Sequence, residues 1–545
     1  MTDTDVLIAG AGPAGLTLAI ELARRGVAHR LVDADPGPFP GSRGKGVQPR
    51  TLEVFDDLGV LDAVFAAGSA YPPVRAYRGD EVVDVGDLMP RRAATPAVPY
   101  PNGWMSPQTT TERILAARLR ELGGTVEYDT ALVSFTQDAA AVRAELKTGE
   151  TVTARYLVGA DGGRSTVRAG LGVGFLGETR EGQRGIVADL PVAGLDRDHW
   201  HFWGDGADTG VGLCPLGGTD LFQLQAPLLH GEEPTPDTAG VHALFAARAG
   251  VDLALGEVRW ASVWRANIRM VDAYRVGRVL LAGDAAHVHS PVGGQGLNTS
   301  IQDAYNLGWK LAGVLRGAPD ALLDSYQQER LPVAARVLGL STALHDRSIA
   351  GNGIAMRRNA PELAQLTIGY PDSPLSVDAT SPDPRAGERH PADAAPGATA
   401  SGVATASGDT TASGAATASR DAAASGDAIV SGGVLRAGDR APDAPCHEAD
   451  GTPVRLFDVF RGPHATLLAF GAGPVPAARP GLVVRRVVRP GAAVSGAAVS
   501  GAVVDTDGHA HRAYRGRLVL VRPDGYVGYV GDDAGLAAYL PVLGL

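Results

Sequence analysis

One short stretch of the sequence concentrates residues that could do chemistry. Residues 280–298 read LLAGDAAHVHSPVGGQGLN and contain Asp284, the pair His287 and His289, and three glycines. Two histidines separated by one residue could supply two metal ligands, whereas a glycine run lets backbone amides approach a phosphate or a flat ring. Neither a third histidine nor a carboxylate beside the pair completes a ligand set. We therefore expect the histidines to pack or hydrogen-bond within the turn, and we predict no metal site.

A second glycine motif lies near the start of the chain. GAGPAG places Gly10, Gly12 and Gly15 in the spacing G-x-G-x-x-G, after the apolar run at residues 5–9 and before a helical pattern and a second apolar run that ends in Asp33. In a strand–helix–strand unit these glycines allow the turn, the approach of a pyrophosphate and close helix packing. The helix N-terminus would stabilise the phosphates, and Asp33 would bind ribose hydroxyls. The motif predicts a dinucleotide site that favours FAD or NAD over NADP.

The bulk composition limits the class of protein. The chain has 545 residues, a net charge of -11, 45% hydrophobic and 20% charged residues, and two cysteines, Cys214 and Cys446. The length predicts two or three domains, and the acidic balance argues against non-specific binding to nucleic acid. Two distant cysteines exclude a disulfide framework, and the sequence shows neither a signal segment nor a membrane span. We expect a cytoplasmic protein with no nucleic-acid or membrane partner.

Strand and helix patterns alternate through the first two thirds of the chain. Residues 112–122 predict an amphipathic helix, and YLVGADG and RVLLAGDAA each predict a buried strand that ends in a turn. This alternation predicts a parallel sheet with helices. Between about residues 180 and 272 apolar and polar residues alternate, which predicts an antiparallel sheet and a separate substrate domain. The candidates for an aromatic pocket wall, with burial in the sheet core as the alternative, are Trp200, Phe202, Trp203, Phe222, Trp260 and Trp264.

The composition changes in the last third of the chain. Residues 385–433 are mostly Ala, Ser, Thr, Gly and Asp, with a serine every six residues from Ser401 to Ser431. A six-residue period could form a β-helix, but almost no aliphatic side chains are present to fill its core. We predict a disordered linker, followed by a compact domain at 434–545.

Two further segments complete a pattern with the glycine motif. YLVGADGGRSTVR places Asp161 and Gly162 at a strand end, and SRGKGVQPRTLEVF places Arg43 in a glycine-flanked loop ahead of a helix. With Gly283 and Asp284, three signature segments then occur in order: G-x-G-x-x-G, DG and GD. Over about residues 1–345 the chain resembles the flavin-dependent aromatic hydroxylases, single-component FAD monooxygenases that include phenol hydroxylases and aromatic polyketide hydroxylases.

This resemblance implies roles for individual residues. Asp284 would contact the ribose or ribityl hydroxyls of the flavin, and the loop 291–298 would run beside the isoalloxazine, where amides and the helix dipole stabilise charge on the reduced ring. Arg43 is the catalytic candidate, which would steer the ring or hold the reductant. Gln108 would reach the ribityl chain, and Leu132 would lie at the adenine end. The alternatives are a surface arginine, a helix-entry glutamine and a core leucine.

In the same family the DG aspartate, here Asp161, serves both flavin and pyridine nucleotide, with capping of the following turn as the alternative. The complete set of predicted cofactor-binding residues is Gly10, Gly12, Ala14, Gly15, Asp33, Ala34, Arg43, Gln108, Leu132, Asp161, Gly283, Asp284, Pro291, Gly293, Gly294, Gln295, Gly296, Leu297 and Asn298.

The resemblance also implies the architecture. We predict an α/β fold: a Rossmann-like FAD-binding domain, an inserted antiparallel-sheet substrate domain, and a C-terminal thioredoxin-like domain. The turn after ATLLAF, where such a domain would carry C-x-x-C, reads GAGP, so thiol–disulfide chemistry is excluded and a packing or dimerisation role is left, with a homodimer as one arrangement. The predicted boundaries are 1–75, 103–179 and 273–384 for the FAD-binding domain with its interface helices, 76–102 and 180–272 for the substrate domain, 385–433 for the linker, and 434–545 for the thioredoxin-like domain.

The reaction implied by the family uses NADPH or NADH to reduce FAD, then O₂ to form a flavin C4a-hydroperoxide that hydroxylates an aromatic ring. A phenolic, polycyclic substrate of polyketide type is the leading expectation. Baeyer–Villiger oxygenation of a ketone, inactivation of an antibiotic, and a non-catalytic flavin-carrying scaffold are the alternatives.

Overall fold

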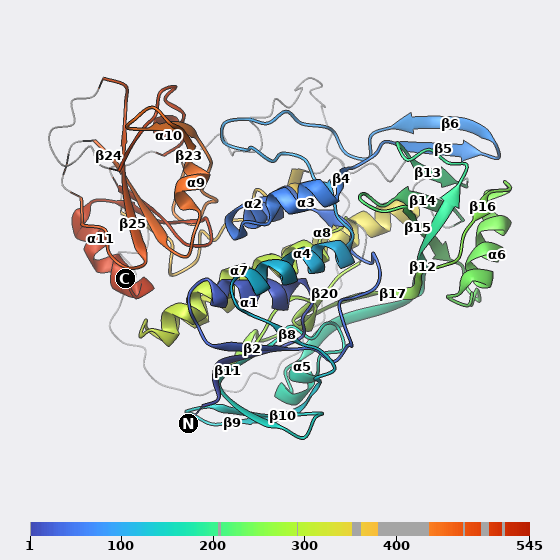
Figure 1. Ribbon diagram of the computed structural model, residues 1–545, viewed down its shortest axis with the longest axis horizontal. Helices are drawn as coiled ribbons and strands as arrows, with labels where there is room; N and C mark the ends of the chain where they lie inside the picture. Colours follow the sequence, from blue (N-terminus) through green and yellow to red (C-terminus); the bar gives the residue numbers. More distant parts are fainter. Residues whose placement is uncertain are drawn as a thin grey trace, which may run out of the picture.

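The computed structural model describes residues 2–204, 209–290, 293–350, 361–379, 435–471, 473, 475–491, 501–514 and 518–545, with the backbone alone at 345–350. The predicted linker, residues 385–433, lies outside the described residues. Four sheets organise the rest, and Figure 1 shows them arranged from the C-terminal part of the chain at one end to the sheet around β12–β17 at the other. The domain boundaries given above from the sequence are still predictions.

The first sheet carries the glycine motif. Its main path runs β18-β19-β11-β1-β2-β8, with β10 and β9 attached to β11. The strands are β1 (Thr4–Ala9), β2 (His29–Val32), β8 (Val126–Glu127), β9 (Leu132–Gln137), β10 (Val142–Leu146), β11 (Thr151–Gly159), β18 (Arg275–Val276) and β19 (Val279–Leu281). Strands β19, β11, β1, β2 and β8 are parallel to one another, as the alternation of strand and helix patterns predicts.

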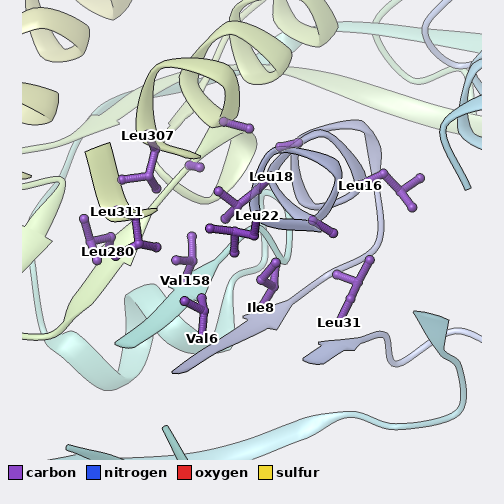
Figure 2. Packing of buried hydrophobic residues seen from close by; sticks show 14 of the residues in the cluster. Val6, Ile8, Leu16, Leu18, Leu22, Leu31, Val158, Leu280, Leu307 and Leu311 are labelled. Atoms are coloured by element: carbon purple, nitrogen blue, oxygen red, sulfur yellow. The ribbon is translucent and has the colours of Figure 1, made fainter. Parts of the chain in front are cut away.

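Helices α1 (Pro13–Ala23) and α7 (Gly296–Leu315) pack against each other above this sheet. Figure 2 shows their leucines gathered over the apolar side chains of β1, β11 and β19: Leu18, Leu22, Leu307 and Leu311 over Val6, Ile8, Val158 and Leu280. Helix α1 ends at Ala23, and the N–H of Arg24 closes its last turn by donating to the carbonyl of Ile20. The predicted helix at 112–122 is α4 (Gln108–Glu121), which begins four residues earlier.

The second sheet is largely antiparallel, as the alternation at 180–272 predicts, and runs β20-β17-β12-β15-β14-β13-β5-β6 with β16 attached to β12. Its strands are β5 (Val74–Arg78), β6 (Glu81–Gly86), β12 (Phe175–Ala193), β13 (Trp200–Trp203), β14 (Val211–Pro215), β15 (Leu221–Leu228), β16 (Ala254–Leu255), β17 (Trp260–Val271) and β20 (His287–Val288). Helix α6 (Thr238–Ala249) packs Val241 and Phe245 into its apolar core. Strand β6 forms one edge (Figure 1) and leaves Val82, Val83 and Val85 about half exposed.

The third sheet lies in the C-terminal part, in the order β21-β28-β27-β24-β25-β26-β22-β23. Its strands are β21 (Val377–Asp378), β22 (Pro445–Glu448), β23 (Pro453–Arg455), β24 (Ala465–Phe470), β25 (Leu482–Val488), β26 (Ala502–Val504), β27 (Leu518–Val521) and β28 (Val527–Gly531). Helices α9 (Leu456–Phe460), α10 (His509–Ala513) and α11 (Asp533–Tyr539) accompany it, with a 3-10 turn at Leu540–Leu543.

Short elements connect these layers. A small sheet joins β3 (Gly46–Val47), β7 (Trp104–Met105) and β4 (Ser69–Ala70). The remaining helices are α2 (Pro49–Leu58), α3 (Leu61–Ala67), α5 (Thr166–Leu171), α8 (Ala321–Ala350), and 3-10 turns at Gly283–Ala285 and Pro361–Ala364. Within the described ranges, no helix combines the length and the apolar character that crossing a bilayer requires.

Candidate active site

The predicted site residues meet because four parallel strands end in register. Ala9 at the end of β1 lies beside Val32 of β2 and Gly159 of β11, and Gly159 lies beside Leu281 of β19. The residues that follow these strand ends are the Asp33, Gly10, Asp161 and Gly283 of the sequence motifs. The carboxyl edge of a parallel sheet is where such folds bind ligands.

Glycines let these turns pack closely. Gly10 has φ +101°, and a Cβ there would lie 2.8 Å from Cα of Asp161 and overlap the carbonyl of Ala160. At Gly15 a Cβ would overlap the carbonyl oxygen of Gly10. Gly283 has φ +64°, and its Cβ would lie 2.9 Å from Ser300 Oγ and 3.2 Å from Ala14 Cβ. The GxGxxG turn therefore contacts the DG turn directly, and the GD turn contacts helices α1 and α7.

Gly12 behaves differently from its neighbours and provides a test of cofactor fit. A Cβ added at Gly12 would meet no protein atom within 4 Å. No side chain caps the N-terminus of α1 at this residue, where the helix dipole is positive and the first backbone N–H groups have no partner within the helix. A glycine with free room beside an uncapped helix end fits a pyrophosphate, so the residues present fit the predicted FAD.

The Asp33 carboxylate ties the glycine turn to the end of β2. It accepts hydrogen bonds from the backbone N–H of Ala11 (2.5 Å) and of Asp35 (2.8 Å), while burial raises its pKa. The N–H of Thr130 donates to the carbonyl of Asp33 at 2.7 Å, which brings Leu132, 8% exposed at the start of β9, to the same side as Asp33. Ala34 is exposed beside them. This grouping is the predicted ribose and adenine end.

Asp284 stands in the 3-10 turn Gly283–Ala285. Its side chain reaches solvent, yet the surrounding protein raises its pKa by desolvation, while the charges of His287 and Arg43 lower it. Ser300 Oγ lies 3.5 Å from Asp284 Oδ1. Arg43, 241 positions earlier in the chain, thus lies within electrostatic range of the GD aspartate.

The two histidines of this motif belong to a buried hydrogen-bond network. His287 Nε2 lies 2.6 Å from Asp303 Oδ2, and His287 Nδ1 lies 3.0 Å from His289 Nε2. Arg330 Nε donates to the other oxygen of Asp303 at 2.6 Å, and the N–H of Gly283 donates to Oδ2 at 3.1 Å. Burial lowers the pKa of His289 to about 3, which keeps that imidazole neutral. The pair thus hydrogen-bonds within and beyond the turn, and among the described residues no group of His, Cys, Asp or Glu is placed to hold a metal ion.

The glycine loop before α7 is fastened to the loop that follows Arg43. Gly293 and Gly294 have φ of +97° and +62°. Asn298 Nδ2 donates to the carbonyls of Gly46 and Gly294, both at 2.8 Å, and Asn298 Oδ1 accepts from the N–H of Gln48 at 2.7 Å. The side-chain amide of Asn298 therefore hydrogen-bonds to backbone groups of both loops, and we infer that it holds the two loops in position. Pro291 lies outside the described residues.

The other predicted residues of this loop are also placed. Gln295 is buried and donates to the carbonyl of Gly293 at 2.9 Å, and no side chain caps the N-terminus of α7, which starts at Gly296. Leu297 packs against Gly44, where an added Cβ would lie 3.0 Å from Leu297 Cδ1. The helix end is therefore available to an anion or to an electron-rich ring edge.

Arg43 and Gln108 lie beside Gly44, which also contacts Leu297 of α7. The guanidinium of Arg43 is exposed and lies 4.9 Å from the ring centre of Phe39. Gln108 Oε1 accepts from the N–H of Gly44 at 3.3 Å, and Gln108 Nε2 donates to Glu112 at 2.8 Å. Burial raises the pKa of Glu112 to about 7. Gln108 thus supports the Arg43 loop through its side-chain amide.

Asp161 fills the capping role that the sequence left as an alternative. Its carboxylate accepts from Ser165 Oγ at 2.5 Å and from the N–H groups of Thr166 and Val167 at 2.7 and 3.1 Å. These donors belong to the first turn of α5. Desolvation nevertheless raises the pKa of Asp161. Its contact with a cofactor stays a prediction.

Sequence reasoning missed three residues that shape this region: Gln48, Glu112 and Asp303. Glu112 stands four residues after Gln108 on one helix, a spacing that places both on the same face and could have identified it. Asp303 lies in the amphipathic helix after the glycine loop, where no local pattern indicates that it binds His287.

A cavity of about 190 Å³ lies on the far side of Gln48. Gln48 Nε2 is 3.4 Å from the carbonyl of Gly293, so the cavity adjoins the glycine loop. Its lining includes Tyr71, Met89 and Trp104 together with Leu363. None of the aromatic residues proposed from the 180–272 sheet contributes. Of these, Trp200, Trp203 and Phe222 are core residues at 3%, 3% and 1% exposure.

The chain is similar to known FAD-dependent proteins along most of its length. The chain matches a family model described as FAD binding domain over residues 3–341 and one described as aromatic-ring hydroxylase, C-terminal, over residues 435–542. It is 44% identical to a flavin-dependent monooxygenase of Mycobacteroides abscessus over 97% of both chains. It is 42% identical to 6-methylpretetramide 4-monooxygenase of Streptomyces rimosus, over 68% of this chain and 71% of that one.

Solved structures agree with these matches. A ternary complex of aklavinone-11 hydroxylase with FAD and aklavinone superposes with a TM-score of 0.74 at 27% identity, covering 99% of this chain and 98% of that one. The predicted fold class, an α/β FAD-binding domain with an inserted sheet and a C-terminal domain, is confirmed.

Proposed function

Because the chain belongs to the flavin-dependent monooxygenase family, we propose that it binds FAD along the edge formed by β2, β1, β11 and β19 and hydroxylates an aromatic substrate with O₂ and NADPH or NADH. The observation that carries this proposal is the convergence of the GxGxxG, DG and GD turns with the uncapped N-termini of α1 and α7. The substrate class we propose is phenolic and polycyclic.

The assignment of the cofactor follows the order of the turns along the edge. The Gly12 turn would hold the pyrophosphate, Asp33 with Leu132 the adenosine end, and Asp284 the ribityl hydroxyls. The N-terminus of α7 at Gly296 would face the isoalloxazine. NADPH or NADH is proposed as a co-substrate that docks transiently.

When bound, FAD would supply the redox chemistry that couples oxidation of a reduced nicotinamide to the use of O₂, with one oxygen atom going to the substrate and the other to water. The protein contributes position and electrostatics. The backbone N–H groups at the start of α7 stabilise negative charge, because a helix N-terminus carries about half a positive charge. The exposed guanidinium of Arg43 adds a second positive charge within electrostatic range of Asp284.

The cavity beside Gln48 is our candidate for the substrate ring. A cavity of about 150 Å³ lined by apolar residues can hold benzene, so the 190 Å³ cavity has room for an aromatic ring. Met89, Tyr71 and Trp104 supply the apolar and aromatic contacts that an aromatic ligand needs. Its position next to the carbonyl of Gly293 would bring that ring to the proposed isoalloxazine.

A spectrum of the purified protein and a screen for ligand-stimulated NADPH oxidation test the proposal together. We expect a yellow protein whose NADPH oxidation is accelerated by some phenolic or polycyclic compounds, with a product heavier by one oxygen atom. A colourless protein that added FAD cannot reconstitute would refute the assignment. Bound flavin without stimulation by any aromatic compound would favour the scaffold alternative.

Two variants locate the substrate. Met89→Trp fills the cavity with a larger side chain, so the substrate ring can no longer be buried there. The KM for the aromatic compound should rise by at least about tenfold. Val83→Trp, on the exposed edge strand β6, is the matched control and should leave KM unchanged. NMR of the product separates hydroxylation from Baeyer–Villiger insertion, and loss of antimicrobial potency of an oxidised drug would support the antibiotic alternative.

A further inference from the structure

The loop that carries Arg43 is held from two sides by side chains of two different layers. On the side of the first sheet, Glu112 Oε2 accepts from the N–H of Phe39 at 2.9 Å, and Gln108 Oε1 accepts from the N–H of Gly44 at 3.3 Å. Both acceptors stand on α4. This side fixes the two ends of the segment 39–44.

On the side of the second sheet, a buried carboxylate holds the residue next to Arg43. Asp189 of β12 accepts from Ser42 through both oxygens: from the backbone N–H at 2.8 Å and from Oγ at 2.5 Å. Gln223 of β15, which lies directly opposite Asp189 in the sheet, donates to the carbonyl of Ser42 at 2.8 Å. Lys45 Nζ donates to Gln223 Oε1 at 2.5 Å and lies 4.3 Å from the ring centre of Trp200.

These contacts are almost free of water. Asp189, Ser42 and Gln223 are 3%, 1% and 0% exposed. Desolvation raises the pKa of Asp189, against the hydrogen bonds from Ser42 and the charge of Lys45. Buried hydrogen bonds to a carboxylate are stronger than those between neutral groups, so the position of Ser42 follows that of β12 closely.

Arg43 stands between these anchors with its side chain exposed, and its charge partly opposes the desolvation that raises the pKa of Asp284. A displacement of Ser42 would move the adjacent guanidinium relative to the GD aspartate and to the proposed flavin. Since β12 and β15 are central strands of the second sheet, the anchor joins that sheet to the cofactor edge.

We propose that Asp189 is a positioning residue that, through Ser42, sets the place of the Arg43 guanidinium at the flavin and transmits displacements of the second sheet to it. The proposal rests on the proposed function for the presence of the flavin. It assigns Asp189 no contact with substrate or cofactor.

Hydrogen exchange of the FAD-loaded protein tests the anchor without any turnover. In Asp189→Asn the side-chain NH₂ replaces one of the two oxygens that accept from Ser42, so at least one of these hydrogen bonds loses its acceptor and the other loses its charged acceptor. We expect amide exchange in peptides covering residues 40–46 to accelerate by about tenfold. Ser42→Ala, which removes the Oγ donor alone, should give a smaller change in the same peptides.

Asp196→Asn is the matched control. This aspartate belongs to the same layer, is 34% exposed and contacts Arg75 at 2.7 Å and His199 at 2.8 Å, neither of which belongs to the loop. Its exchange in residues 40–46 should equal that of the parent protein. Equal exchange in Asp189→Asn and in the parent would overturn the proposal.

The visible circular dichroism of bound FAD separates positioning from mere anchoring. We expect Asp189→Asn to reproduce at least about half of the change caused by Arg43→Ala, because the same guanidinium is displaced. The stimulation of NADPH oxidation by an aromatic ligand should also fall by about tenfold, with KM for that ligand nearly unchanged. If amide exchange of residues 40–46 accelerates in Asp189→Asn while the circular dichroism of bound FAD is unchanged, Asp189 holds the loop but does not position Arg43 at the flavin. That result would contradict the proposal. Failure of every aromatic ligand to stimulate the parent protein would instead contradict the proposed function, and the exchange and flavin spectra would still decide the role of Asp189.

Discussion

The FAD-binding part of the molecule meets its two neighbours through junctions of different chemistry. Toward the second sheet, one carboxylate, Asp189, receives neutral donors of Ser42. Toward the third sheet, carboxylates form ion pairs with arginines: Glu53 pairs with Arg440 at 2.5 Å, and Glu329 pairs with Arg522 at 2.6 Å. Removing one partner of a buried ion pair leaves a charge without compensation, whereas a neutral donor can be exchanged at lower cost.

The ion cluster at the C-terminal junction is closed to solvent. Glu329, Arg522 and Lys310 each have side chains 0% exposed, and Arg522 also binds Asp524. Burial lowers the pKa of Lys310 to about 8, although the charge of Glu329 opposes that shift. Burial would raise the pKa of Glu329, but Arg522 and Lys310 outweigh it and hold the value below its ordinary range. We call the junction with the third sheet the rigid junction, because loss of one of its buried ions leaves a charge without compensation, whereas Asp189 at the other junction receives neutral donors.

Breaking the rigid junction should have the largest effect. Arg522→Gln leaves Glu329 and Asp524 buried with fewer cations, so we expect the free energy of unfolding to fall by about 3–5 kcal/mol, measured by chemical denaturation of the FAD-loaded protein. Arg436→Gln, an exposed arginine of the same domain, is the control and should change little. Equal stability of the two variants would remove the contrast between the junctions.

Glu112, which holds the Arg43 loop from α4, should make stability depend on pH. Its folded pKa of about 7 lies above the ordinary 4.5, so the folded state keeps a proton that the unfolded state releases. Stability from this group is full below pH 4.5 and is lost as pH rises to about 7, by up to about 3 kcal/mol. Glu112→Gln should flatten this slope in urea denaturation at several pH values. Glu121→Gln, 63% exposed on the same helix, should retain the slope of the parent.

Two glycine variants should distinguish cofactor binding from folding at the shared strand edge. Gly12→Ala adds a Cβ that meets no protein atom within 4 Å, so the apoprotein should keep its stability while FAD binds at least about tenfold more weakly. Gly15→Ala overlaps the carbonyl of Gly10 and should lower the stability of the apoprotein itself. Fluorescence titration with FAD and thermal denaturation separate the two effects. Unchanged FAD affinity in Gly12→Ala would contradict the pyrophosphate assignment.

An exposed ion pair provides a reference for the free energies of unfolding expected from the buried contacts at both junctions. Arg30 pairs with Glu150 at 2.6 Å with side chains 23% and 49% exposed. Glu150→Gln should lower the free energy of unfolding by about 0.2–1 kcal/mol, and salt should abolish the difference. A loss as large as that of Arg522→Gln would show that burial does not account for the rigid junction.

Much of the fold could be predicted because its signals are local. The strand ends at Asp33, Gly10, Asp161 and Gly283 each consist of an apolar run followed by a turn, and parallel pairing then brings them to one edge. The pairs that hold the layers together are not local. Ser42 and Asp189 are separated by 147 positions, and no periodicity connects them.

The aromatic residues of the second sheet show a second limit. Alternation predicts which residues share a face but not what covers that face, and Trp203 and Phe222 turned out to pack in its core. His287 was expected to hydrogen-bond within the turn, and it also binds Asp303, 16 positions later on α7. Such contacts depend on packing between elements, which the sequence alone does not specify.

The ion cluster has a consequence for biosynthesis. Glu53 and Glu329 are made with Arg50 and Lys310 as nearby cations, whereas Arg440, Arg522 and Asp524 are translated at least 111 positions after Glu329. The nascent chain therefore cannot complete this charge balance before the third sheet is made, and chaperones have an interval in which to bind it. A stop codon before Arg522 would deprive Glu329 of that cation, even though every predicted cofactor-binding motif had already been translated.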